Sequence, residues 1–141
     1  MIMGRINDKI EEIEGYLQEL SEIMPLDFEG YLSDKAKKAA CERYFEKIIG
    51  AIIDLAFIAI KDRNLEMPEE DKKAFDILRG EQVITDSLAE RLSDAKGMRN
   101  ILAHEYGELN DELVYNSVKE EIIRDAEEFI RQIEKFLQDK K

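Results

Sequence analysis

The side chains best suited to acid–base chemistry lie in one short segment, residues 97–106, which reads GMRNILAHEY. It contains His104, the only histidine of the chain. The ordinary pKa of an imidazole lies near neutrality, so His104 can accept or donate a proton at physiological pH. Arg99 precedes it and carries a planar guanidinium, which can donate hydrogen bonds to two oxygens of an anion at once. The segment is therefore the candidate site of chemistry.

Helical spacing places both residues where local patterning is unusual. Arg99 continues, at steps of three and four, an apolar stripe made of Leu88, Leu92 and Ala95. A guanidinium thus falls where a packing side chain is expected. The adjacent stripe is polar and contains a glycine, which allows another backbone or a ligand close in; it consists of Gly97, Asn100 and His104. Such departures from local patterning concentrate at functional sites.

The same residues also have a purely structural interpretation. An arginine on a packing stripe can extend to solvent, or pair with a buried acid such as Asp54. A histidine near the C-terminus of a helix is favourable there because an imidazolium stabilises the exposed carbonyl groups. The spacing of Arg99 and His104 alone does not separate this interpretation from a catalytic one.

Five helices are expected to position this segment. Pro25, Asn64 and Gly80 are expected to end or break helices, and residues 26–32 are expected to form a loop. Ser33, Thr85 and either Asn110 or Asp111 are the expected N-caps. The predicted helices run over about 2–24, 33–63 and 68–78, from 85 through His104 to an end at Gly107, and from 110 or 111 onwards. The third of these is short and acidic.

Apolar stripes at helical spacing predict which faces are buried. The first helix carries Ile6, Ile10, Ile13, Leu17 and Leu20; the second carries Ala40, Tyr44, Ile48, Ile52, Leu55 and Ala59; the last carries Leu113, Val118, Ile122, Phe129, Ile133 and Phe136. The second helix is apolar almost all round and should be the central one. Short connections favour antiparallel neighbours, so we expect an all-α, up-and-down bundle forming one domain over residues 1–141.

Composition and charge limit the possible functions. The one cysteine, Cys41, excludes an internal disulfide, and no secretion signal or membrane span is visible, so a cytoplasmic protein is expected. One histidine and one cysteine are too few for a zinc site, and no metal or cofactor is expected. The formal net charge of −12 opposes nucleic-acid binding unless a local basic patch exists, for example at Arg91, Lys96 and Arg99. An acidic surface with no nucleic-acid role remains an alternative.

The stretch RNILAHEY, residues 99–106, resembles the motif of the HEPN superfamily, in which four residues separate an arginine from a histidine. An asparagine commonly follows that arginine, as Asn100 does here. A tyrosine two positions after the histidine, Tyr106, is similar to the HepT branch of ribonuclease toxins. The likeness extends to residues 43–46 leading to Asp54, and to Tyr106-Gly107 running into residues 110–112. It covers essentially the whole chain.

This resemblance implies metal-independent cleavage of RNA at a site that two chains form across a homodimer two-fold. Arg99 and His104 would be the catalytic residues, and Asn100 would orient His104 or bind substrate. The family also implies a partner, an MntA-like nucleotidyltransferase antitoxin, which would transfer AMP to Tyr106. Tyr106 follows His104 closely enough for the added AMP to block the site.

Two other functions stay open beside the ribonuclease. A non-catalytic HEPN module could use Arg99 and His104 to bind a nucleotide or a nucleotidyltransferase partner. A structural helical dimer would use neither. Lost toxicity in His104→Ala would separate a toxin from a binding module.

Overall fold

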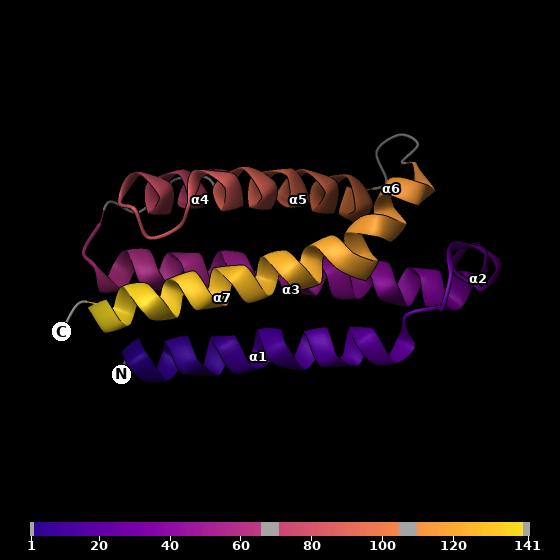
Figure 1. Cartoon of the computed structure of the whole chain (residues 1–141), viewed down its shortest axis with the longest axis horizontal. Helices are drawn as coiled ribbons and strands as arrows, with labels where there is room; N and C mark the ends of the chain where they lie inside the picture. Colours follow the sequence, from indigo (N-terminus) through magenta and orange to yellow (C-terminus); the bar gives the residue numbers. More distant parts are fainter. Residues whose placement is uncertain (1, 66–70, 105–109, 140–141) are drawn as a thin grey trace.

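The computed structural model describes residues 2–65, 71–104 and 110–139, and this part of the chain is helical, without strands. Its body consists of four long helices, α1 (Ile2–Ile23), α3 (Lys35–Asp62), α5 (Asp86–His104) and α7 (Ile122–Asp139), and the shorter α4 (Asp71–Gly80). Successive long helices lie side by side and run in alternating directions (Figure 1). The prediction of an all-α, up-and-down bundle with four long helices and one short helix is confirmed.

Several expected helix ends are confirmed by their hydrogen bonds. Thr85 caps α5, because its Oγ1 accepts a hydrogen bond from the backbone N–H of Leu88 at 3.2 Å. Asn110 caps the short helix α6 (Asp111–Asn116) through Oδ1, which accepts from the N–H groups of the second and third residues of that helix. Asn64 follows α3 with a φ of 56°, a left-handed conformation that asparagine tolerates at helix ends.

The segment expected to be a loop, residues 26–32, instead contains a short helix, α2 (Phe28–Ser33). Asp27 caps it: its Oδ1 accepts a hydrogen bond from the N–H of Gly30 at 2.7 Å. Ser33 is consequently the last residue of α2 rather than the N-cap of α3. That role belongs to Asp34, whose Oδ1 accepts from the N–H of Lys37 at 3.0 Å.

The apolar spacing predicted one continuous last helix, but the structure interrupts it. A π-helical turn, Ser117–Glu121, joins α6 to α7. The extra residue per turn shifts the apolar register. Leu113, which precedes the turn, is 61% exposed, whereas Val118, Ile122, Phe129 and Ile133 are buried and Phe136 is half-buried. The prediction that Leu113 packs in the core is therefore wrong.

One cluster of buried side chains runs through the bundle, and α3 lies at its centre, in contact with α1, α4, α5 and α7. The five-residue stripe predicted on α1 is fully confirmed. On α3 the stripe from Ile48 onwards is buried as expected, but its first half buries Cys41 and Phe45 instead of Ala40 and Tyr44. Among the described residues, no helix has the length and apolarity needed to cross a membrane.

Candidate functional site at the end of helix α5

Helix α5 is buried in its N-terminal half and becomes more exposed towards its C-terminal end. Leu88 and Leu92 are completely buried in the first half of the helix. Met98 and Leu102, in the second half, are only half-buried, and the last residue, His104, is exposed. The helix therefore anchors its N-terminal half in the core and presents its C-terminal half as an open surface, on which the predicted site residues lie.

Arg99 points towards α3, where it meets Gly50. A Cβ atom placed on Gly50 would lie 3.6 Å from Nη2 and 3.9 Å from Cζ of Arg99. The half-buried guanidinium therefore rests against a part of α3 that has no side chain. In the described part of the chain Arg99 forms no ion pair with a carboxylate. Asp54, the acid considered as its buried partner, is exposed and pairs with Lys9 at 3.4 Å.

The other predicted residues lie on the outward face of the same helix. Asn100 and His104 are both exposed and stand four positions apart, which places them on one side of α5. His104 is the last residue of α5 that the structure describes. The structure thus brings Arg99, Asn100 and His104 to one end of α5. Tyr106, the predicted AMP acceptor, lies outside the described residues.

Two glycines, Gly50 of α3 and Gly97 of α5, lie near the site, and only Gly50 is approached closely by a side chain from another helix. Gly97, which was expected to allow a close approach, is exposed, and a Cβ there would meet nothing within 4 Å. Gly50, which sequence reasoning did not single out, is the one that faces Arg99. The sequence contained a signal for Gly50: a glycine inside a long helix costs about 1 kcal/mol of stability relative to alanine, so its presence there indicates a close contact.

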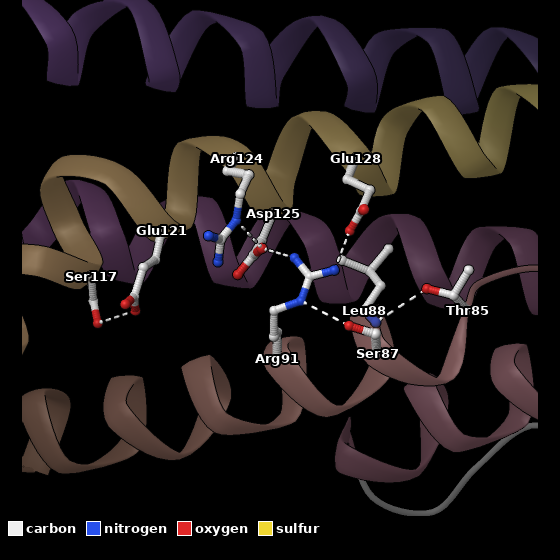
Figure 2. A network of polar contacts seen from close by, with 9 residues as sticks. All are labelled: Thr85, Ser87, Leu88, Arg91, Ser117, Glu121, Arg124, Asp125 and Glu128. Atoms are coloured by element: carbon white, nitrogen blue, oxygen red, sulfur yellow. Dashed lines mark hydrogen bonds and ion pairs between the residues drawn. The ribbon is translucent and has the colours of Figure 1, made fainter.

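The expected basic patch of Arg91, Lys96 and Arg99 does not form as predicted. Arg91 reaches from α5 to α7, where its guanidinium bridges Asp125 and Glu128, the latter at 2.5 Å (Figure 2). Asp125 is only 4% exposed and also accepts a hydrogen bond from Arg124 at 3.2 Å. Arg91 therefore fastens α5 to α7, and its charge is neutralised by carboxylates of this chain.

Comparison with known proteins agrees with the motif and the fold. The chain is 26% identical over 132 residues to the tRNA nuclease HepT of Aphanizomenon flos-aquae, which is 94% of this chain and 89% of that protein. It is 34% identical over 80 residues to the mRNA nuclease HepT of Shewanella oneidensis, a stretch that spans 57% of this chain and 59% of that relative.

A solved structure shares the whole architecture. The tri-AMPylated HEPN toxin of Shewanella oneidensis, in complex with an MNT antitoxin, superposes with a TM-score of 0.85 and 26% identity, covering 92% of this chain and 96% of that one. The chain matches the family described as Ribonuclease HepT-like over residues 10–133. Because this match spans most of the sequence and includes α5 with its Arg99–His104 motif, the chain belongs to the ribonuclease HepT-like family.

Proposed function

We infer that this protein is a HepT-type ribonuclease and the toxin of a toxin–antitoxin pair, whose antitoxin is a nucleotidyltransferase. Its relatives are named as nucleases of tRNA and mRNA, and a HEPN toxin of the same fold has been solved with an MNT antitoxin. The single observation that supports the site is the exposed C-terminal half of α5, where Arg99, without a carboxylate partner among the described residues, precedes His104 by five residues, about 1.4 turns of helix. We further propose that the whole chain acts as one cytoplasmic domain.

The side chains proposed for catalysis suit cleavage of RNA without a metal ion. His104 would take the proton from a ribose 2′-hydroxyl or give one to the departing 5′-oxygen. Arg99 would donate hydrogen bonds to the non-bridging oxygens of the phosphate, where negative charge grows in the transition state. Attack of the 2′-oxygen on phosphorus leaves a 2′,3′-cyclic phosphate. Asn100 would orient His104 or hold the substrate.

A homodimer would complete this chemistry. Cleavage needs both a base and an acid, and each chain has one histidine. A two-fold arrangement of two α5 ends would bring two copies of His104 to one cleft. The outward face that carries Gly97, Asn100 and His104 is exposed and open enough for a second copy to approach. Sedimentation at micromolar concentration should give a dimer, and a monomer would contradict this part of the proposal.

The test of the catalytic assignment is incubation of purified protein with total RNA in the presence of EDTA. We expect the parent protein to cleave, and Arg99→Ala and His104→Ala each to lose cleavage while keeping the parent circular dichroism spectrum. Arg131→Ala, which removes an exposed cation of α7, should cleave like the parent. Equal cleavage by the His104→Ala variant would refute the site. Absence of cleavage by the parent would favour a non-catalytic module that binds a nucleotide or the partner.

We propose that the antitoxin inactivates the toxin by transferring AMP to Tyr106. The phenolic oxygen would attack the α-phosphorus of ATP, release pyrophosphate and lose its proton to solvent. The modified tyrosine would then carry an anion beside Arg99 and His104 and compete with RNA for the phosphate position. Two other tyrosines are poor acceptors because they are buried, Tyr31 completely and Tyr115 to 6% exposure.

The modification is tested with the cognate nucleotidyltransferase, ATP and magnesium, followed by peptide mass spectrometry. AMP should appear on Tyr106, with loss of ribonuclease activity in proportion. The Tyr106→Phe variant should stay unmodified and active in the same mixture. AMP found on another tyrosine, with inhibition intact in Tyr106→Phe, would contradict this assignment without affecting the catalytic one.

A further inference from the structure

A ribonuclease with a formal net charge of −12 needs a local positive surface to hold its substrate. Several cations of the described residues are neutralised by carboxylates of the same chain: Lys38 contacts Glu42 at 2.7 Å, and Arg91 bridges two acids on α7. Arg99 by itself contacts at most one phosphate group. The remaining phosphates of a bound RNA strand therefore require cations elsewhere on the molecule.

A cavity of about 380 Å³ between α1 and α3 gathers three such cations. Arg5 and Lys9 line it from α1 and Lys61 lines it from α3. Arg5 and Lys61 are exposed and form no ion pair within the described residues. Lys9 is already bound to Glu12 at 2.8 Å and to Asp54 at 3.4 Å. Counting Glu12 beside the cavity as well as Asp54 in its lining, three cations face two carboxylates, so the cavity keeps a net charge of +1 although the protein is acidic.

The cavity and Arg99 lie along the same side of α3. Gly50, Asp54, Phe57 and Lys61 follow one another at steps of four, three and four, which puts them on one face of the helix. Gly50 meets the guanidinium of Arg99, and the other three residues line the cavity. At 1.5 Å per residue, Gly50 and Lys61 are about 16 Å apart along the axis. A strand of a few nucleotides can span that distance.

The lining also contains a surface for a base. Phe57 and Ile58 are half-buried, so part of each side chain is open to the cavity. Aromatic side chains beside a positive groove are the usual means by which proteins bind single-stranded nucleic acid without reading its sequence. Cations beside a half-buried aromatic ring fit the phosphates and one base of a single strand.

We propose that this cavity is a second substrate-binding site, in which Arg5 and Lys61 bind phosphates of single-stranded RNA while a more distant phosphodiester is cleaved at Arg99 and His104. The exposed face of α3 is the path between the two sites. Lys9 shapes the cavity rather than binding RNA, because Glu12 and Asp54 already neutralise it. The proposal rests on the ribonuclease function stated above and adds residues that bind substrate without touching the reacting atoms.

The test uses the full-length protein with the double variant Arg5→Ala/Lys61→Ala. Neither side chain makes an ion pair in the described structure, so the melting temperature should stay at the parent value. Binding is measured in a His104→Ala background, by fluorescence anisotropy of a labelled single-stranded oligoribonucleotide at several salt concentrations. Removing two phosphate contacts should lower the slope of log Kd against log salt by about 1.4 and weaken binding about tenfold at 0.15 M salt.

The matched control is Arg131→Ala/Lys135→Ala, which removes the same charge from two exposed residues of α7. It should bind RNA like the parent. In the cleaving protein, Arg5→Ala/Lys61→Ala should raise KM about tenfold and leave kcat unchanged, because both residues act only in binding.

Parent-like RNA affinity and salt slope in Arg5→Ala/Lys61→Ala would overturn the proposal while leaving the catalytic assignment intact. An equal loss in the α7 control would also overturn it, because the effect would then come from net charge alone. If the cavity variant lost affinity only for the nucleotidyltransferase partner, the surface would be a protein contact and the RNA proposal would be wrong. A parent that neither binds nor cleaves RNA would refute the ribonuclease function itself.

Discussion

Because Gly50 contacts Arg99, two substitutions of this glycine should have different effects: alanine should stabilise the protein, and valine should inactivate it. Alanine adds only a Cβ, which would lie 3.6 Å from Nη2 of Arg99, an ordinary van der Waals distance. Replacing a helix-interior glycine also removes a cost of about 0.5–1 kcal/mol. We therefore expect Gly50→Ala to raise the free energy of unfolding by that amount, about 2–4 °C in Tm, and to keep cleavage within a few-fold of the parent.

Valine at the same position should separate stability from activity. Its Cγ atoms extend about 1.5 Å beyond Cβ, and a branched side chain has little rotational freedom in a helix. The guanidinium of Arg99 must then move by about 1 Å or more, a displacement that can cost about 100-fold in rate. Stability should change little, because valine is a better helix former than glycine. Single-turnover cleavage and urea unfolding measure the two effects.

The matched control is Gly15→Val in α1, another long helix, where a Cβ would meet nothing within 4 Å. This variant should be as active as the parent. If Gly50→Val cleaved RNA at the parent rate, the position of Arg99 against α3 would not matter for catalysis and the reasoning would be wrong. If Gly50→Ala lowered stability, the spacing between the two helices would be tighter than the contact indicates.

Two further predictions concern stability. Asp125→Ala removes an acid that is 4% exposed and accepts hydrogen bonds from Arg91 and Arg124, so we expect a loss of about 2–3 kcal/mol in urea unfolding. Glu128→Ala, at a more exposed partner of Arg91, should cost under about 1 kcal/mol, and equal losses would contradict the importance of burial. Tyr31→Phe should cost about 1 kcal/mol at neutral pH, because the buried hydroxyl donates a hydrogen bond to Glu42 at 2.8 Å. Burial, and then that hydrogen bond, raise the pKa of Tyr31, so its contribution is complete below the ordinary tyrosine pKa of about 10 and is lost as the pH rises towards the folded value. The difference between parent and Tyr31→Phe should therefore shrink above about pH 10, and a difference that stayed constant would contradict the assigned cause.

The helices and most of their buried faces could be predicted because they depend on neighbours three and four residues apart. The stripe from Ile6 to Leu20 is buried as its spacing predicts, and Thr85 and Asn110 cap their helices through side chains that bond locally. The candidate site was also visible locally, as Arg99 on an apolar stripe close to the only histidine. Breaks in regular structure were harder to foresee. The short helix after Asp27 lies where a loop was expected, and the π-helical turn at residues 117–121 interrupts a periodicity that the sequence continues.

The sequence by itself determined that this chain forms a helical bundle with a polar pair near the end of one helix, because 3.6-residue periodicity and capping are properties of each segment alone. The tertiary structure decided which groups those side chains meet. Arg91 was expected beside Arg99 but is neutralised by carboxylates of α7, whereas Arg99 lies against Gly50 of α3. The cavity that joins Arg5 to Lys61 brings together residues from α1 and α3. Contacts between residues of different helices depend on the register and crossing angle of the packed helices. These are set by the fit of many side chains and not by the spacing within one helix.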